Sequence, residues 1–436
     1  MSKAIKNQAG ILEKLNIKAL NEMQLHAQKV IYANNDVILL SPTGTGKTLA
    51  FLLPLIAELD PQIEEIQLLI LVPSRELAIQ INQVIRDMGT GYKTNAVYGG
   101  KSGSKDRMEI KHRPAILVGT PGRVADHLRR DTFDISHIKT LVLDEFDKSL
   151  EVGFEVEMKD IIHHLSAVEK RILTSATQGV EIPNFVGLRK PETVNYLKGG
   201  DSKLLLKVIH SPEKDKLDTL IKTLQHIGNE PGIIFCNFKE SIQRLSEYLT
   251  ERGVPHGCFY GGIEQIDRER ALLKFRNGTH QIIIATDLAA RGIDVPEMKF
   301  IIHYQLPHRL EEFTHRNGRT ARMNAEGTAF IIQWEKENLP DFVGDIEVEE
   351  LTRNVSLKAS QWKTLFISGG RKDKISKGDI AGLFFKKGNL EKHELGIIEI
   401  KEECAFVAVH AKLALPLIKA LNNQFIKKRK VRISIA

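Results

Sequence analysis

The chain has 436 residues, of which 42% are hydrophobic, and a formal net charge of +7. This length predicts two or three domains with full cores, and the absence of an apolar run of 18 residues argues against a transmembrane helix. The amino-terminal segment lacks the apolar stretch of a signal peptide, and the three widely spaced cysteines form no metal or redox pattern. We therefore expect a reduced, cytoplasmic protein with no membrane partner.

The positive charge is concentrated at the end of the chain. Residues 358–436 contain 17 Lys and Arg against 7 Asp and Glu, a net charge of +10, so the rest of the chain carries −3. A basic terminal segment on a nearly neutral body indicates a polyanion partner, most often a nucleic acid. A basic surface that serves only solubility is the alternative.

Residues 1–200 alternate short apolar runs with helix-like stretches, which is the pattern of a parallel sheet covered by helices. We expect strands at 37–40, 68–72, 115–118, 140–143 and 171–173. A polar motif follows each of these five runs. Because ligands of open α/β sheets bind at the carboxyl ends of the strands, we expect the five loops along one edge of a single sheet.

The loop after the first expected strand is typical of phosphate binding. It reads Ser41-Pro42-Thr43-Gly44-Thr45-Gly46-Lys47-Thr48. Backbone N–H groups of such a loop cradle phosphate oxygens at the start of a helix, and its glycines permit close approach. Lys47 is expected to reach the β- and γ-phosphates, and the Thr48 hydroxyl to bind Mg²⁺. A chance turn rich in Gly and Thr is the alternative.

The loop after the fourth expected strand carries adjacent carboxylates, in the order Asp144-Glu145-Phe146-Asp147. We predict that Asp144 holds Mg²⁺, in part through water, and that Glu145 positions the attacking water. Phosphoryl transfer needs such positioning and charge neutralisation more than covalent chemistry. An exposed acidic helix start is the alternative. Together with loop 41–48, however, the tetrad predicts hydrolysis of a nucleoside triphosphate.

The alternation resumes after a linker expected at 198–207. Strands are expected at 232–236, 281–285, 300–303 and 328–332. This half contains no phosphate loop, so we expect the nucleotide at the interface of two similar folds. Arg319 and Arg322 lie three residues apart and, if this segment is helical, share one face of the helix. They could clamp a γ-phosphate as arginine fingers do; a solvated basic helix is the alternative.

A second linker is expected in the acidic stretch 341–350, before a small carboxyl-terminal domain. The expected elements of that domain follow the order β-α-β-β-α-β, at 364–368, 377–385, 396–400, 405–409, 413–421 and 431–435. This order is that of a ferredoxin-like or RRM-type module.

In order and spacing, these motifs resemble those of the DEAD-box RNA helicases of superfamily 2, over residues 10–335. Segment 41–48 matches motif I, and 144–147 matches motif II with Phe146 where alanine is usual. Gln265 and Arg268 fit the Q-x-x-R element. Segments 285–287 and 290–294 fit motif V. Segment 315–322 fits motif VI, with Asn317 and Ala321 replacing the usual aliphatic residue and glycine.

The resemblance implies an α/β fold of two tandem RecA-like parallel-sheet domains followed by a small RRM-like α+β domain. The ATP-binding domain would span 1–200, the helicase carboxyl-terminal domain 208–345 and the RRM-like domain 358–436. The cofactors would be ATP and Mg²⁺, and the activity would be RNA-dependent ATP hydrolysis.

The resemblance also implies roles for individual residues. Lys47, Asp144, Glu145, Arg319 and Arg322 would be catalytic, and Ser175 and Thr177 would couple hydrolysis to RNA. Nucleotide would be bound by Gln24, whose amide can read adenine, by loop 41–48, and by Gly292 and Asp294. Contacts with the RNA backbone, which carry no sequence information, would come from Arg75, Gly99, Gly100, Thr120, Arg123, Arg268 and Thr286.

Residues 370–409 resemble the RNA-binding domain of DbpA-type helicases, which recognises a hairpin of large-subunit ribosomal RNA. RRM sheets usually stack bases on aromatic side chains, and the two usual positions of the expected third strand hold Cys404 and Phe406. We therefore expect RNA capture by the basic segments 371–377 and 427–432. The expected contacts are Arg371, Lys372, Lys374, Lys428 and Arg429.

The expected protein is thus a monomeric, ATP-dependent RNA helicase. It would remodel or unwind short RNA duplexes, in ribosomal RNA of a pre-ribosomal particle during large-subunit assembly. An ATP-gated RNA clamp with little unwinding is the alternative. A DNA helicase is a third hypothesis, against which the RRM-like module argues.

Overall fold

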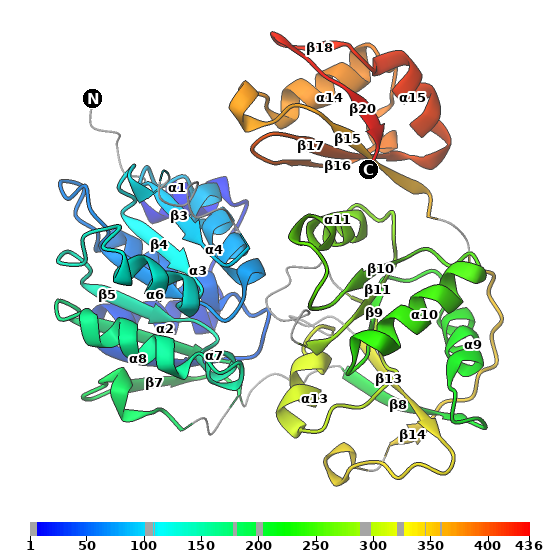
Figure 1. The fold of residues 1–436 in the computed structure, drawn as a ribbon, viewed down its shortest axis with the longest axis horizontal. Helices are drawn as coiled ribbons and strands as arrows, with labels where there is room; N and C mark the ends of the chain where they lie inside the picture. The colour runs from blue at the N-terminus through cyan, green and yellow to red at the C-terminus, as the bar shows by residue number, and fades with distance from the viewer. Residues whose placement is uncertain are drawn as a thin grey trace. The chain divides into compact units, whose positions relative to one another are not determined.

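The structure, a computed structural model, describes residues 7–100, 108, 110–177, 181–197, 204–287, 298–320, 327–344, 346–357 and 360–436, with only the backbone at 151, 265 and 266. The chain divides into two compact units, with the first boundary along the chain between residues 202 and 203. The first unit contains one parallel sheet, and the second contains another parallel sheet and a small antiparallel domain (Figure 1).

A parallel sheet, with seven strands among the described residues, forms the centre of the first unit. Its strand order is β3-β4-β2-β5-β6-β1-β7. The strands are β1 (Asp36–Leu40), β2 (Leu68–Leu71), β3 (Thr94–Val97), β4 (Ile116–Gly119), β5 (Thr140–Leu143), β6 (Lys170–Ser175) and β7 (Glu192–Asn195). Five neighbours in this order, β4-β2-β5-β6-β1, are the strands expected from the sequence. The prediction that their five loops share one edge is therefore confirmed.

Helices cover both faces of this sheet. The described helices of the first unit are α1 (Gln8–Lys14), α2 (Glu22–Ala33), α3 (Lys47–Ala57), α4 (Arg75–Met88), α6 (Pro121–Arg129), α7 (Phe146–Glu151) and α8 (Glu155–His164). Alternate strand residues enter opposite cores: Leu68 and Ile70 join one hydrophobic cluster, and Leu69 and Leu71 join the other. The strands are apolar on both faces because both faces are buried.

A second parallel sheet, with the order β10-β11-β9-β12-β13-β8-β14 in the described chain, opens the second unit. Its strands are β8 (Leu204–Ser211), β9 (Gly232–Phe235), β10 (His256–Phe259), β11 (Ile282–Ala285), β12 (Phe300–His303), β13 (Gly327–Trp334) and β14 (Glu347–Val348). Its described helices are α9 (Leu217–Ile227), α10 (Lys239–Glu251), α11 (Gln265–Arg276) and α13 (Leu310–Asn317).

Both expected linkers are wrong in part. Residues 204–207, expected in the first linker, are the start of β8, which pairs along its whole length with β13. The acidic stretch 341–350 contains β14, which pairs with β8 at the edge of the second sheet. Backbone pairing overrides the polar composition there, because an edge strand needs to bury only part of its side chains.

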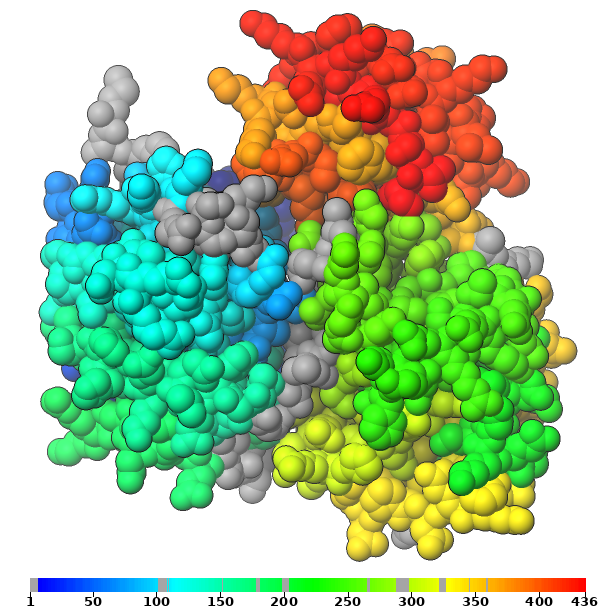
Figure 2. All heavy atoms as spheres, in the orientation of Figure 1, coloured from blue at the N-terminus to red at the C-terminus, as the bar shows by residue number. Residues whose placement is uncertain are grey.

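Residues from 360 onward form the β-α-β-β-α-β module, drawn in orange and red in Figures 1 and 2. Its sheet has the order β16-β17-β15-β20 and is antiparallel. The elements are β15 (Trp362–Ile367), α14 (Lys377–Lys386), β16 (Leu395–Ile400), β17 (Ala405–His410), α15 (Ala414–Leu421) and β20 (Ile433–Ile435), with a hairpin of β18 (Phe425–Ile426) and β19 (Arg429–Lys430) before the last strand. The predicted fold class is confirmed in all three domains.

Candidate functional site

The phosphate loop joins the end of β1 to the start of α3. Gly44 and Gly46 have φ values of 83° and 86°, a left-handed conformation that residues with a Cβ rarely adopt. Lys47 opens α3, and its buried ammonium group donates to the backbone oxygens of Ser41, at 2.5 Å, and Pro42, at 2.9 Å. The loop thus surrounds its own lysine, at a helix N-terminus of the kind that binds phosphate.

Gln24 lies beside this loop, as the nucleotide-binding prediction requires. Its side-chain amide nitrogen donates to the Gly46 oxygen at 3.2 Å, while its amide oxygen accepts from the Asn21 N–H in a capping box at the start of α2. A Cβ on Gly46 would lie 2.4 Å from the Gln24 amide nitrogen. Asn21 donates in turn to the Thr45 oxygen at 3.0 Å, so α2 and the phosphate loop form one hydrogen-bonded assembly.

The acidic tetrad follows β5, next to β6 in the sheet. Asp144 is 3% exposed, and Glu145 adopts a left-handed backbone with φ 48° and ψ 51°. The Thr174 hydroxyl on β6 donates to a carboxylate oxygen of Asp144 and accepts the Glu145 N–H at 3.1 Å. Thr174 was not among the predicted site residues, and its only sequence signal is its position directly before Ser175.

Burial determines the protonation of Asp144. Desolvation, and then the neighbouring charge of Glu145, raise the pKa of the Asp144 carboxyl from 3.8 to about 6, against the opposing effects of the Thr174 hydrogen bond and the Lys47 charge. A buried carboxylate in this state is stabilised by any cation that reaches it.

The predicted coupling residues join the same tetrad. The Thr177 hydroxyl donates to Asp147 at 2.8 Å, and the Ser175 hydroxyl donates to the Thr177 oxygen at 3.0 Å. The Ser175 oxygen accepts the Ser41 N–H at 3.1 Å. The tetrad, the segment 175–177 and the phosphate loop are therefore directly connected through backbone and side-chain hydrogen bonds.

Phe146, the departure in the tetrad, is a core residue. Its side chain is 2% exposed and belongs to the hydrophobic cluster that includes Leu143 and Met158. The same cluster includes Met158 and Ile161 of α8. The residue that departs from the family pattern therefore fills the core of the domain.

Three of the predicted RNA contacts lie together in the first unit. A Cβ on Gly100 would lie 2.6 Å from a guanidinium nitrogen of Arg75, and one on Gly99 would lie 3.4 Å from the other. Gly100 also has φ 85°. The structure thus places the Arg75 guanidinium against the Gly99-Gly100 turn, where no larger residue at position 100 would fit without displacing it.

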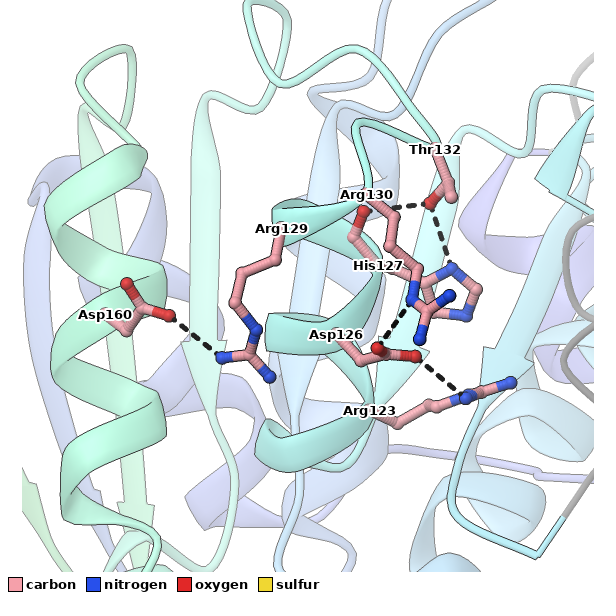
Figure 3. Close-up of polar contacts among 7 residues, drawn as sticks. All are labelled: Arg123, Asp126, His127, Arg129, Arg130, Thr132 and Asp160. Atoms are coloured by element: carbon pink, nitrogen blue, oxygen red, sulfur yellow. Dashed lines mark hydrogen bonds and ion pairs between the residues drawn. The ribbon is translucent and has the colours of Figure 1, made fainter.

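The other two contacts predicted in this unit lie at α6. Thr120 is the residue before the helix, and Arg123 lies in its first turn. Arg123 and Arg130 share the Asp126 carboxylate, at 3.0 and 2.7 Å, while Arg129 reaches Asp160 on α8 at 3.3 Å (Figure 3). The hydrogen bond from Arg130 is the main reason why the pKa of Asp126 is lowered. Arg123 is thus held in place on a surface that carries three arginines.

Arg268 and Thr286 lie together in the second unit, beside the end of β10. The Arg268 guanidinium is stacked over the Phe259 ring at 4.7 Å, and the Thr286 N–H donates to the Phe259 oxygen at 3.3 Å. Arg268 lies on α11, on which the side chain of Gln265 is outside the described residues.

The segment of the expected arginine fingers is helical only up to Asn317. α13 ends at Asn317, with Gly318 as its C-cap, so Arg319 lies beyond it in the following turn. The condition under which Arg319 would share a helical face with Arg322 is therefore not met at Arg319. Arg319 is buried in the second unit, whereas Arg322, Gly292, Asp294 and Ala321 lie outside the described residues.

Arg316, in the last turn of α13, was missed by the sequence reasoning. It is 1% exposed and pairs with both Asp287 oxygens, at 2.6 and 2.5 Å, while also donating to Asn237 and the Gln305 oxygen. Charge burial of this kind is tolerated only with full pairing. The arginine anchors α13 to the ends of β9, β11 and β12.

The two basic segments of the carboxyl-terminal domain form one surface. The Lys427 ammonium donates to the Lys374 oxygen at 2.5 Å, and Arg429 lies 3.6 Å from the Asp373 carboxylate. The five predicted contacts Arg371, Lys372, Lys374, Lys428 and Arg429 are all exposed. Residues about 55 positions apart in the chain therefore present their charges side by side.

Aromatic side chains of this sheet lie on β15, at Trp362 and Phe366, as well as on β17, at Phe406. Phe366 on β15 is paired in register with Phe406 on β17, and their rings meet edge to face at 5.6 Å. Cys404 precedes β17 and is not on the strand. On the same face, Thr364 lies 2.7 Å from the Thr279 hydroxyl that follows α11, and Glu399 pairs with Arg276 at 3.2 Å. Part of the usual RNA platform therefore contacts the second RecA-like domain.

Two RecA-like domains, the first with a phosphate loop beside an acidic pair, define a nucleoside triphosphatase of the helicase type. Profiles of known families agree: the DEAD/DEAH box helicase family matches residues 21–185, the helicase conserved C-terminal domain matches 215–324, and the DbpA RNA binding domain matches 364–435.

Similar proteins extend over almost the whole chain. The ATP-dependent RNA helicase DbpA of Bacillus subtilis is 31% identical, over 98% of this chain and 96% of its own length, and that of Escherichia coli is 30% identical, over 97% and 96%. The structure of Saccharomyces cerevisiae Dbp5 bound to RNA and ADP BeF3 covers 78% of this chain and 93% of its own, at 26% identity and a TM-score of 0.69. The chain therefore belongs to the DEAD-box ATP-dependent RNA helicases and is DbpA-like.

The family supports ATP and RNA as ligands and RNA-dependent ATP hydrolysis as the activity. Among the residues that the structure describes, no helix has the length and apolar character needed to cross a membrane.

Proposed function

We propose that ATP is hydrolysed at the edge of the first sheet, with Asp144 and the Thr48 hydroxyl holding Mg²⁺ and Glu145 positioning the attacking water. Buried Asp144 supports this assignment, because its ionisation is opposed by desolvation and by Glu145. Carboxylate and hydroxyl oxygens suit Mg²⁺, and the ion, when bound, would neutralise charge on the phosphates.

The remaining roles in this proposal follow the predicted motifs. Gln24 would read adenine, and Lys47 would reach the phosphates from the loop. Gly292 and Asp294 would contact the nucleotide, and Arg319 and Arg322 would act as arginine fingers. Ser175 and Thr177 would couple the site to RNA.

Glu145→Gln tests the hydrolytic assignment. The variant should bind ATP as well as the unmodified protein does and lose its RNA-stimulated turnover, because the amide cannot act on water as the carboxylate does. Equilibrium nucleotide binding and phosphate release are the measurements. Glu169→Gln, at an exposed carboxylate paired with Lys139, is the matched control. Normal turnover in Glu145→Gln would refute the assignment.

We also propose that RNA passes along Arg75, Gly99, Gly100, Thr120 and Arg123 of the first domain and along Arg268 and Thr286 of the second. The domains would span 1–200, 208–345 and 358–436, in a protein that works as a monomer. The clustering of these residues at loops that follow parallel strands supports the path, since such loops carry the ligands of α/β sheets.

We further propose that the target is a hairpin of large-subunit ribosomal RNA within a pre-ribosomal particle, and that the basic surface formed by Arg371, Lys372, Lys374, Lys428 and Arg429 captures it. The observation that carries this proposal is the joining of the two basic segments through Lys427 and Arg429. Arginines and lysines on one surface can bind the successive phosphates of an RNA backbone. Part of the sheet face instead contacts Arg276 on α11 and Thr279 after it.

The triple variant Arg371→Ala, Lys374→Ala, Lys428→Ala tests this surface. We expect affinity for a ribosomal RNA hairpin to fall by about 10- to 100-fold at low salt, with a shallower dependence on salt concentration. The matched control replaces three exposed lysines on the helices, Lys386, Lys412 and Lys419. ATPase stimulation by the hairpin, by generic RNA and by single-stranded DNA completes the comparison.

Equal affinity in the two triple variants would refute the capture surface. Equal stimulation by hairpin and generic RNA in the unmodified protein would refute the ribosomal target. Strand separation measured beside turnover distinguishes a helicase from an ATP-gated clamp, because a clamp would hydrolyse ATP without separating strands.

A further inference from the structure

Thr174 occupies the position where the two central strands of the first sheet deliver their loops. β5 and β6 are paired in parallel register, with Leu143 opposite Leu173. Asp144 directly follows β5, and Thr174 is the next residue of β6, so the carboxylate and the hydroxyl lie side by side. Thr174 is fully buried, which excludes water as a competing partner for its hydroxyl group.

The Thr174 hydroxyl uses both of its hydrogen-bonding capacities on the acidic pair. Its proton is donated to a carboxylate oxygen of Asp144, and its oxygen accepts the backbone N–H of Glu145 at 3.1 Å. A hydroxyl group has one proton to donate, so this arrangement fixes its rotation. One side chain therefore holds the direction of one carboxylate and the backbone that carries the next.

The backbone at Glu145 needs such support. Its φ of 48° and ψ of 51° lie in the left-handed region, which is unfavourable for a residue with a Cβ and persists only where the surroundings determine it. The Glu145 oxygen accepts from the N–H groups of Lys148 and Ser149, at 3.0 and 3.1 Å, at the start of α7. Its N–H is held by Thr174, so the peptide groups on both sides of the turn are fixed.

We propose that Thr174 is a positioning residue of the ATPase site, which aims the Asp144 carboxylate and holds Glu145 in its left-handed turn. This proposal rests on the roles proposed above for Asp144 and Glu145. It differs from the coupling predicted for Ser175 and Thr177, because Thr177 bonds to Asp147 and leaves the carboxylates of 144 and 145 untouched. Segment 174–177 thus bonds to the first carboxylate of the tetrad through Thr174 and to the last through Thr177.

Thr174→Val removes the hydroxyl and keeps the shape of the side chain. We expect kcat for RNA-stimulated ATP hydrolysis to fall about tenfold or more, since a hydrogen bond to a charged group and the alignment of Glu145 are both lost. KM for ATP and the affinity for ADP should change by less than about threefold, because no group that touches the nucleotide is removed. Thr174→Ser, which keeps the hydroxyl, should restore kcat to within about threefold.

The control is Thr140→Val, at the far end of β5, which should leave kcat unchanged. Thermal unfolding of every variant separates positioning from folding, and Thr174→Ala replaces the valine variant if that one does not fold. A normal kcat in Thr174→Val, an equal loss in Thr174→Ser, or a rise in KM at constant kcat would each overturn the proposal. Normal turnover in Glu145→Gln would instead refute the proposed catalytic assignment itself.

Discussion

The two parallel sheets of this helicase have the same topology but different chemistry at the same edge. The first has the order β3-β4-β2-β5-β6-β1-β7, and the second has β10-β11-β9-β12-β13-β8-β14, so that every strand has a counterpart seven numbers later. A lysine lies at the start of the helix that follows the first strand in both, Lys47 at α3 and Lys216 at α9.

The surroundings of these two lysines differ. Lys47 follows a loop with left-handed Gly44 and Gly46, whereas the residues before Lys216, Pro212-Glu213-Lys214-Asp215, include no glycine. The Lys216 ammonium donates to the Ile332 oxygen at 2.9 Å and lies 5.5 Å from the centre of the Tyr304 ring. Tyr304 follows β12, where Asp144 follows β5. Topology therefore places a lysine at the sheet edge twice, but only the first loop can turn its N–H groups toward phosphate.

The largest expected effect is on ATP turnover, and it distinguishes Lys47 from Lys216. Lys47→Ala should lower RNA-stimulated ATP turnover by a factor on the order of 10³, because charge neutralisation of the phosphates carries most of phosphoryl-transfer catalysis. Lys216→Ala should leave turnover within about threefold and destabilise the second domain by about 1 to 2 kcal/mol through a lost buried hydrogen bond. Turnover and thermal unfolding of both variants are the measurements. A similar loss of turnover in the two would contradict this comparison.

Phe146 lies three residues after β5, and Leu306 lies three residues after the corresponding strand β12. Replacing each of them compares the packing beneath the two sheet edges. Phe146→Ala should destabilise the first domain by about 3 to 5 kcal/mol, because the ring is almost fully buried and leaves a cavity. Leu306 is half-buried, and its replacement by alanine should cost less than about 2 kcal/mol. Denaturant unfolding measures both. An unchanged stability with an altered KM for ATP in Phe146→Ala would show that the ring acts on the nucleotide site instead.

Asp144 makes the first domain less stable at neutral pH than in mild acid. Its folded pKa of about 6 exceeds the ordinary value of 3.8, so the folded state binds its proton more tightly, and this stabilisation is lost as the pH rises through 6. Asp144→Asn should therefore stabilise the domain by up to about 3 kcal/mol at pH 7.5. The gain should vanish below about pH 4, as thermal unfolding across pH would show. A gain independent of pH would refute this explanation.

His303, the last residue of β12, is expected to give the second domain the opposite pH dependence. Burial, and then the Arg316 charge, lower its pKa from 6.5 to about 3. The unfolded chain therefore binds the proton first, and stability present above pH 6.5 is lost as the pH falls toward 3. This amounts to about 2 kcal/mol between pH 7 and pH 5.

His303→Phe should reduce the pH slope of second-domain stability, measured by hydrogen exchange of β12 and β13. The ring would remain between Phe235 and Phe313, whose ring centroids lie 6.2 and 4.8 Å from that of the imidazole. His210→Gln, at an exposed position of β8, should leave the slope as it is. Equal slopes in His303→Phe and the unmodified protein would contradict the assignment.

The strands that sequence reasoning missed share one property. β3 and β7 are the two edges of the first sheet, and β10 and β14 are the two edges of the second. Central strands bury both faces and therefore form apolar runs that can be recognised, whereas an edge strand such as Glu192–Asn195 buries only Val194. β8 lies inside the sheet but has a mixed burial pattern, with only Val208, Ile209 and Ser211 buried, and its first four residues fall in the expected linker.

The end of α13 shows a second limit. Arg319 and Arg322 would share a face only if their segment were helical, but α13 ends at Asn317. Arg316, which the sequence analysis gave no role, is buried among Asp287, Asn237 and the Gln305 oxygen. Sequence spacing indicated which residue types were present. It could not indicate that the first arginine is a structural anchor, because its partners come from three other segments.

Local sequence patterns predict the motifs of the helicase, because apolar runs indicate buried strands and glycines indicate where the backbone can adopt unusual conformations. Those patterns identified the phosphate loop, the acidic tetrad and the strands after which they lie. The tertiary structure decided which loops became neighbours: β6 beside β5 placed Thr174 on Asp144, and the β18–β19 hairpin placed Lys427 on Lys374. Hydrogen bonds between distant segments depend on strand order and register, and no single stretch of sequence contains that information.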